Sequence, residues 1–212
     1  MQEDYFLTIS KQELSLLPPA KFDGRIEVVD SEDRAVETIA EIRKAPLVGF
    51  DTETRPSFKK GMLNEVALMQ LSTEDTCYLF RLNKIGLCKS LLDFIEDEKC
   101  VKVGLSLHDD FHNLHRIADF EPKGFIDLQH YVKQFKILDN SLSRINAIVF
   151  GKRISKGQRL SNWEASELSE AQKGYASLDA VACMSIYREL QSGRFDPLSS
   201  PFLHYADRDN PV

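Results

Sequence analysis

Cysteine is scarce in this sequence, and long apolar runs are missing. The four cysteines are widely spaced and form no CxxC pair, which argues against a disulfide framework and against a zinc site. No stretch approaches the roughly 18 apolar residues that a membrane span needs. The chain begins Met-Gln-Glu-Asp, without the positive and apolar regions of a signal peptide. We therefore expect a cytoplasmic protein that does not contact a membrane.

Positive charge is also in the minority. There are 27 Lys and Arg residues against 33 Asp and Glu, which gives a net charge of −6. This balance argues against a general nucleic-acid binder, which is usually basic. Positive charge is nevertheless concentrated in residues 151–160, which contain no acid and four basic residues: Lys152, Arg153, Lys156 and Arg159. A smaller basic group lies earlier in the chain, at Arg55, Lys59 and Lys60.

Signatures of several enzyme classes are absent as well. The chain contains no GxSxG, no P-loop and no HExxH motif. His108, His112 and His115 would share a helix face, so a zinc site at these histidines is one interpretation. A solvated helix face with one histidine near a site is the simpler interpretation.

The order of apolar and polar segments predicts one α/β domain. Strands are expected at 25–30, 47–53, 65–71, 76–82, 100–105 and 124–128, and helices at 31–43, 87–97, 109–118, 129–136, 141–150 and 169–190. Short turns join the strands at 47–53, 65–71 and 76–82, which predicts an antiparallel meander. Later strands alternate with helices, so we expect a mixed central sheet flanked by helices. Residues 1–24 are predicted to be an irregular arm, 25–195 the domain and 196–212 a tail.

Two pairs of polar residues have the spacing of a site. Asp51 and Glu53 are two apart on a predicted strand, so both carboxylates project from one face. Tyr175 and Asp179 are four apart on a predicted helix and also share a face. Taken alone, the first pair would usually be a solvated strand end and the second a surface hydrogen bond. Buried carboxylates, in contrast, need a cation or another partner.

A further acid lies near the start of the helix predicted at 109–118. Capping of the helix is the simplest role for an acid at this position. Asp110 and Asp109 are both candidates, and helical phase separates them. Asp110 shares a face with Leu114, whereas Asp109 aligns with the polar Asn113.

Together these acids match the ligands that hard divalent cations prefer. Magnesium and manganese bind carboxylate and water oxygens. Two such ions about 3.5–4 Å apart can stabilise both the attacking and the leaving oxygen in phosphodiester cleavage. The acids therefore predict a site for two Mg²⁺ or Mn²⁺ ions.

At these positions the chain resembles the DEDDy branch of the DnaQ-like 3′→5′ exonucleases. Within that family the likeness is nearest to the exonuclease domains of Werner-type helicases, with ribonuclease D more distant. It covers roughly residues 45–192, in the stretches FDTETRPSFKKG with EVALMQLSTEDTCYLF, VGLSLHDDFHNL, LSRINAIVFGKRISKGQRLSNW and LSEAQKGYASLDAVACMSIYREL. The resemblance implies a ribonuclease H-like fold. It also implies hydrolysis at the 3′ end of DNA or RNA, with DNA favoured, and release of nucleoside 5′-monophosphates.

The resemblance also assigns roles to individual residues. Asp51 would bridge both metals, Glu53 and Asp179 would hold the nucleophile-side metal, and Asp110 would support the other through water. Tyr175 would position the attacking water. Groups expected to contact the substrate are Thr52, Leu68, Met69, Lys152, Arg153, Lys156, Arg159 and Trp163. The alternative is a catalytically weak module that binds nucleic-acid ends, but no acid of the pattern is missing, which favours the enzyme.

Overall fold

A six-stranded mixed sheet forms the centre of the structure, a computed structural model that describes residues 4–57, 59, 61 and 63–205. Its strands, in spatial order, are β2 (Arg25–Val29), β5 (Thr76–Phe80), β4 (Val66–Ser72), β3 (Leu47–Thr54), β6 (Val101–Gly104) and β7 (Phe125–Asp127). The β3–β4 and β4–β5 pairs are antiparallel, and the remaining three pairs are parallel. The predicted meander and the mixed strand directions are therefore confirmed.

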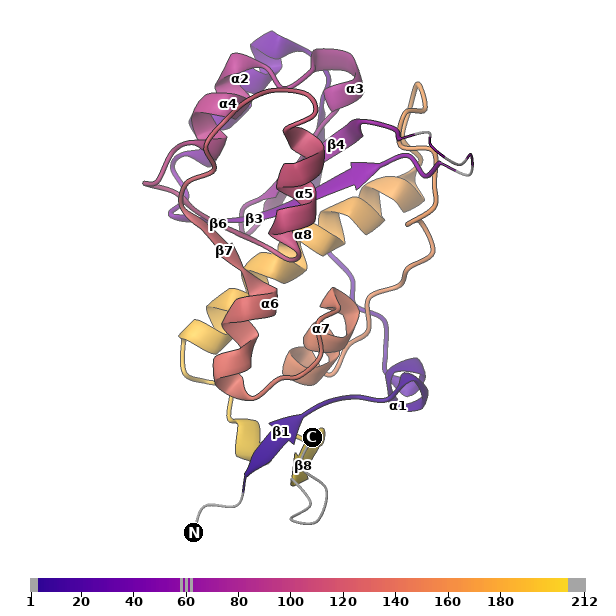
Figure 1. Cartoon of the computed structure of the whole chain (residues 1–212), viewed down its shortest axis with the longest axis vertical. Helices are drawn as coiled ribbons and strands as arrows, with labels where there is room; N and C mark the ends of the chain where they lie inside the picture. Colours follow the sequence, from indigo (N-terminus) through magenta and orange to yellow (C-terminus); the bar gives the residue numbers. More distant parts are fainter. Residues whose placement is uncertain (1–3, 58, 60, 62, 206–212) are drawn as a thin grey trace.

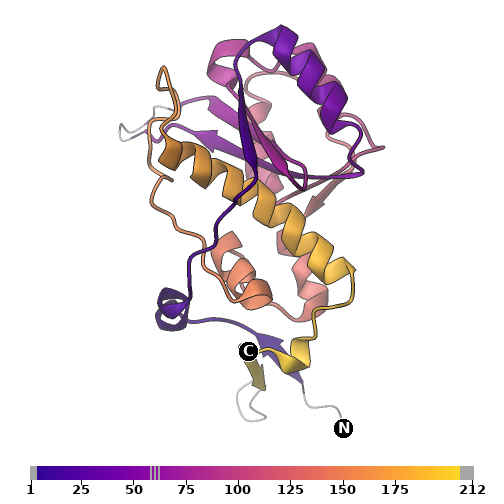
Figure 2. The same cartoon turned by 180° about the vertical axis from the view of Figure 1, so that it is seen from behind.

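Helices cover both faces of this sheet (Figure 1). The helices α2 (Glu32–Ile42), α4 (Lys89–Ile95) and α5 (Leu107–Leu114) pack on one face, around buried side chains such as Phe50 and Phe80. The long helix α8 (Glu170–Gln191) crosses the opposite face, as Figure 2 shows from behind. Four further helices are α3 (Leu82–Ile85), α6 (Leu128–Tyr131), η1 (Val132–Phe135) and α7 (Leu142–Phe150). Within the described residues, no helix combines the length and apolar character that crossing a membrane requires.

The start of α8 is fixed by a capping box. The Ser169 hydroxyl accepts a hydrogen bond from the Gln172 backbone N–H, and the Gln172 side chain accepts one from the Ser169 backbone N–H. This helix begins where the sequence predicted it. Its first half packs against β3 near Asp51 and Glu53.

The N-terminal arm, predicted to be irregular, contains regular structure. It forms β1 (Tyr5–Leu7) and α1 (Lys11–Leu16). β1 pairs antiparallel with β8 (Leu203–Tyr205), which follows η2 (Pro197–Ser199), so the two ends of the described chain lie side by side. The prediction failed because this pairing joins segments about 200 residues apart, and no local pattern reports such a contact.

Candidate active site

Close contact between β3 and α8 brings the acids together. A Cβ atom added at Gly49 would lie 1.9 Å from the backbone oxygen of Ala180, so only glycine permits this approach. Gly49, Asp51 and Glu53 alternate along β3 and therefore share the face that α8 covers. Ala180 directly follows Asp179. The glycine thus sets the separation between the β3 carboxylates and the α8 carboxylate.

Three of the predicted acids form one compact group. One carboxylate oxygen from each of Asp51, Glu53 and Asp179 lies within 4.8 Å of the other two. Glu53 and Asp179 are buried, and Asp51 is half-buried. The buried Oδ1 atom of Asp179 has no hydrogen-bond partner among the described residues. An unpartnered buried carboxylate oxygen is costly, and a cation would relieve that cost. The group therefore fits a divalent cation with oxygen ligands.

Asp110 reaches the site from the start of α5. Its carboxylate accepts a hydrogen bond from the Thr52 hydroxyl, although it lies outside the three-acid group. The carboxylate of Asp127 holds the beginning of α5 by accepting hydrogen bonds from the backbone N–H groups of Ser106 and Leu107, at 3.3 and 2.9 Å. The neighbouring Asp109 side chain is 80% exposed and faces His108. The structure thus directs Asp110 toward β3 and Asp109 toward solvent.

All four acids have raised pKa values. Burial is the largest cause in every case, because it disfavours the charged form. It raises the pKa of Glu53 to about 8, with the charges of Asp179 and Asp110 adding to the effect and that of Arg159 opposing it. The pKa values of Asp110 and Asp179 rise to about 7. The pKa of Asp51 is raised well above its ordinary value by burial and by its three acidic neighbours. Without a cation, this cluster holds protons near neutral pH.

Tyr175 lies one helical turn before Asp179 on α8. Burial, followed by the charges of Asp179 and Glu53, raises the pKa of its phenol above the ordinary value of 10.0. The hydroxyl therefore stays protonated at neutral pH. Behind it lies the fully buried Trp163, with a ring centroid 6.1 Å from that of Tyr175 and an interplanar angle of 34°. The tyrosine ring is thus supported by a second aromatic ring.

The predicted basic residues divide into three groups. Lys156 and Arg159 line a hollow of about 260 Å³ together with Tyr175 and Asp179. The charge of Lys156 acts to lower the pKa of Asp179, and that of Arg159 acts to lower the pKa of Glu53. Lys152 lines a separate hollow behind α8. Arg153 turns to the N-terminal arm, where its Nε donates to the backbone oxygen of Leu17 at 3.0 Å.

The smaller basic group contributes one clear contact. Arg55 forms an ion pair with Glu164 at 3.0 Å, which joins the segment after β3 to the segment before α8. Lys59 is exposed. Lys60 lies outside the described residues.

Three residues expected to contact the substrate have buried side chains. The side chains of Leu68, Met69 and Trp163 each have 0% exposure, because β4 is covered on both faces and Trp163 fills the space behind Tyr175. Any contact that they make in this conformation is therefore indirect, through the backbone or through a neighbour.

Gln70 is a residue beside the site that the sequence reasoning missed. It is directly opposite Asp51 in the β3–β4 register, so the two side chains share a face. Gln70 is fully buried, and neither polar atom of its amide has a hydrogen-bond partner among the described residues. Its polar side chain within the apolar strand predicted at 65–71 was the sequence feature that could have identified it.

The three histidines do not form a metal site with other residues. Among the described residues, the acidic group is the one set of at least three His, Cys, Asp or Glu side chains with metal-ligand spacing. His115 stacks on Phe120, with ring centroids 4.2 Å apart, and His108 is 94% exposed. All three histidines are exposed, so the helix face is solvated as expected, and none of them belongs to the acidic group.

Comparison with known proteins points to one family. Residues 26–193 match a family model described as 3′-5′ exonuclease. The mouse bifunctional 3′-5′ exonuclease/ATP-dependent helicase WRN is 31% identical over 184 residues, which cover 82% of this chain and 13% of that protein. An Arabidopsis thaliana 3′-5′ exonuclease is 30% identical over 190 residues, which cover 82% of this chain and 66% of that protein. The chain thus spans less than two thirds of either relative.

The fold has solved counterparts. The crystal structure of the Aedes aegypti Nibbler EXO domain superposes with a TM-score of 0.73 at 22% sequence identity, covering 84% of this chain and 96% of that one. At this level of identity the likeness concerns the fold. It confirms the predicted ribonuclease H-like architecture, with the mixed sheet and its flanking helices.

Proposed function

Because the chain belongs to the 3′-5′ exonuclease family, we propose that it is a metal-dependent enzyme that shortens nucleic acid from the 3′ end. It hydrolyses the terminal phosphodiester bond and releases nucleoside 5′-monophosphates. DNA is the favoured substrate, on the likeness to helicase-linked exonuclease domains, and RNA is the alternative.

The observation that carries this proposal is the grouping of Asp51, Glu53 and Asp179 within 4.8 Å. The unpartnered buried oxygen of Asp179 is an available ligand atom beside them. These three residues would hold one divalent cation between β3 and α8, and Asp110 would help to hold a second from α5. Two Mg²⁺ or Mn²⁺ ions bound there would supply positive charge to the attacking and leaving oxygens of the phosphodiester.

Tyr175 orients the attacking water in this proposal. Its raised pKa keeps the phenol neutral, so the hydroxyl can form a hydrogen bond with water but does not act as a phenolate base. The Trp163 ring behind it limits its movement. Holding water in position for attack is a general source of rate enhancement.

Lys156 and Arg159 are the proposed contacts of the phosphate nearest the scissile bond. Both line the hollow that contains Tyr175 and Asp179. Neither forms an ion pair with an acidic side chain in the portion of the chain that the structure describes. Their positive charges are therefore available to a polyanion, whereas the net charge of the whole chain is −6.

The deciding experiment is a product assay. Single-stranded DNA and RNA, each labelled at the 5′ end, are incubated with the protein in Mg²⁺, in Mn²⁺ and in EDTA. We expect a ladder that shortens one nucleotide at a time, only with a divalent cation. Chromatography of the released, unlabelled products should show mononucleotides that carry a 5′-phosphate.

Two outcomes would contradict the proposal. Unshortened substrate in both metals, with retained binding of 3′ ends, would indicate the end-binding module instead. Shortening that continues undiminished in EDTA would contradict the role of the acidic group as a metal site.

A further inference from the structure

We propose that a hollow between the N-terminal arm and α8 binds one nucleotide of the strand whose 3′ end occupies the acidic site. This inference rests on the proposed function and extends it, because it adds a second contact point for the strand. The family model begins at residue 26. The arm that forms one wall of the hollow therefore lies outside the matched region.

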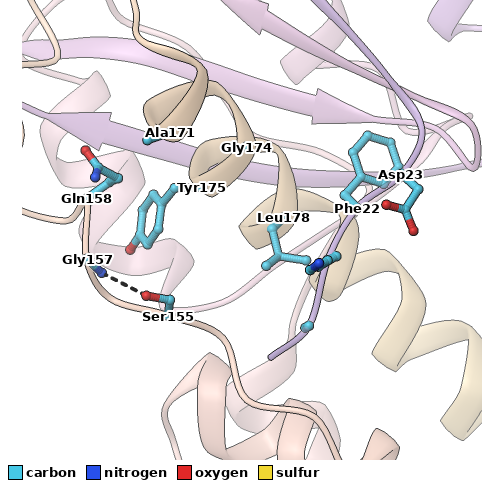
Figure 3. Close-up of a pocket in the computed structure, with 11 residues that line it drawn as sticks. Phe22, Asp23, Ser155, Gly157, Gln158, Ala171, Gly174, Tyr175 and Leu178 are labelled. Atoms are coloured by element: carbon cyan, nitrogen blue, oxygen red, sulfur yellow. Dashed lines mark hydrogen bonds between the residues drawn. The ribbon is translucent and has the colours of Figure 1, made fainter. Parts of the chain in front are cut away.

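The hollow has the size and lining of a ligand site. Its volume of about 380 Å³ falls within the range of about 300–1,000 Å³ typical of small-molecule pockets. Figure 3 shows Tyr175 and Gln158 at one end, Phe22 and Asp23 at the other, and the α8 residues Gly174 and Leu178 between them. The walls thus offer an aromatic ring, apolar surface and hydrogen-bonding groups, which is what a nucleoside requires.

The hollow adjoins the acidic site. Tyr175 lines both this hollow and the hollow that contains Asp179, Lys156 and Arg159. Residues 155–159 form the partition, since Ser155 and Gly157 face the arm side while Lys156 and Arg159 face the acids. A strand that leaves the acidic site across this segment enters the hollow next.

The arm is hydrogen-bonded to Arg153, just before that partition. The Arg153 backbone N–H donates to the Pro18 oxygen at 3.0 Å, and the Ala20 N–H donates to the Arg153 oxygen at 2.8 Å. The Arg153 guanidinium adds a bond to the Leu17 oxygen at 3.0 Å. The arm therefore forms a fixed wall of the hollow.

Positive charge continues from the acidic site into the hollow. Lys21 lines it and also lines the next hollow along α8, which Lys152 borders. Among the described residues, neither lysine forms an ion pair with an acidic side chain. Asp23 is the one acid in the lining, and its carboxylate can accept a hydrogen bond from a base amino group. The cations follow a path suited to successive phosphates.

Gly174 keeps the floor of the hollow open. Glycine inside a helix is unfavourable, and here no packing contact requires it, because an added Cβ would meet no atom within 4 Å. The space above Gly174 is therefore not used by the fold. A Cβ atom at this position would enter the hollow without displacing any protein atom.

The test uses Gly174→Leu, which fills the hollow, and Lys21→Ala, which removes its cation. Binding of a fluorescent single-stranded dodecamer is measured by anisotropy in EDTA over a range of salt concentrations. We expect Gly174→Leu to raise Kd by roughly tenfold, the loss of one stacked nucleotide. Lys21→Ala should lower the log–log salt slope by about 0.7. Lys133→Ala, which changes an exposed lysine of η1 that lines none of these hollows, is the matched control and should leave Kd unchanged.

Cleavage of a dodecamer and of the p-nitrophenyl ester of thymidine 5′-monophosphate separates this inference from the proposed function. The variants should lose kcat/KM on the dodecamer and retain it on the ester, which has no second nucleotide to enter the hollow. An equal loss on both substrates would place the effect in the acidic site and overturn the inference. Unchanged binding by both variants, or a loss confined to Lys133→Ala, would also overturn it. A wild-type protein that binds the dodecamer but cleaves nothing would instead refute the proposed function alone.

Discussion

Asp51 is the acid whose pKa is raised by all three of its acidic neighbours. Its pKa is raised by burial and by Asp179, Asp110 and Glu53, so its charge destabilises the fold when no cation is bound. We expect Asp51→Asn to lower cleavage by at least about 10³-fold, since charge stabilisation of several kcal/mol is lost. The same change should raise the melting temperature in EDTA. An active variant, or one that melts earlier than the wild type, would contradict the assignment.

Asp110 and Asp109 form a natural pair for comparison. Asp110 accepts a hydrogen bond from Thr52, whereas Asp109 is 80% exposed. We therefore expect Asp110→Asn to reduce kcat in Mg²⁺ by at least about a hundredfold, and Asp109→Asn by less than about threefold. Steady-state rates on one single-stranded DNA measure both. The opposite ranking would show that Asp109 is the ligand.

Tyr175 should matter less than any carboxylate. Its neutral hydroxyl contributes one hydrogen bond to water, worth about 0.5–1.5 kcal/mol. Tyr175→Phe should therefore lower kcat by roughly tenfold or less and leave the Mg²⁺ requirement unchanged. Single-turnover rates at saturating Mg²⁺ provide the measurement. A loss as large as that of Asp51→Asn would mean that the phenol has another role.

Residue identities near the site were only partly predictable from sequence. Spacing alone places Asp51 with Glu53, and Tyr175 with Asp179, on shared faces, as the structure shows. The burial of Trp163 and the position of Gln70 opposite Asp51 depend on how α8 lies over the sheet. No periodicity within a single element contains that information.

Among the elements, the contact between β3 and α8 is the most sensitive to a single atom. The Cβ of Gly49→Ala would collide with the Ala180 oxygen at 1.9 Å, so α8 must move away from β3. We expect a loss of about 1–3 kcal/mol in the free energy of unfolding, as for overpacked cores. Cleavage should fall further than stability, because Asp179 moves away from Asp51. Urea denaturation and kcat measure the two effects.

Gly174→Ala is the matched control for stability. It adds the same methyl group to α8, but into open space. We expect its free energy of unfolding to equal or exceed that of the wild type. Equal losses in the free energy of unfolding of the two variants would show that the collision with Ala180 does not cause the loss in Gly49→Ala.

Helices with caps were more predictable than pairings between distant strands. The Ser169–Gln172 capping box predicts the start of α8, and the structure forms both of its hydrogen bonds. The same signature is present at Ser10 and Glu13, where it begins α1 within an arm predicted to be irregular. The arm was nevertheless predicted to be irregular, because Pro18 and Pro19 usually end a helix. The pairing of β1 with β8 had no comparable local signature.

For the whole molecule, the acidic cluster predicts a stability that falls as pH rises. The pKa of Glu53 is about 8 and those of Asp110 and Asp179 about 7, against ordinary values of 4.5 and 3.8. The folded protein therefore retains protons that the unfolded chain has already released. Stability from these groups is fully present below about pH 4 and is lost as pH rises through about 7–8. Each proton contributes a slope of about −1.36 kcal/mol per pH unit.

Chemical denaturation in EDTA between about pH 5 and pH 8.5 measures this slope. Asp179→Asn should flatten it, since one of the titrating groups is removed. Millimolar Mg²⁺ should restore stability mainly at the high end of the range, where the carboxylates are free to bind it. A stability that rises with pH in EDTA would contradict the proton-holding cluster.

The pairing of β1 with β8 has a mechanical consequence. Tyr5 pairs with Tyr205 and Leu7 with Leu203, so both ends of the described chain leave the ladder on the same side. Tension applied at these two points separates the two strands like a zipper, one residue pair at a time. Each pair opens at low force, and the six-stranded sheet bears no load until the ladder is fully open. The β1–β8 sheet therefore opens before tension reaches the six-stranded sheet that carries the acidic residues.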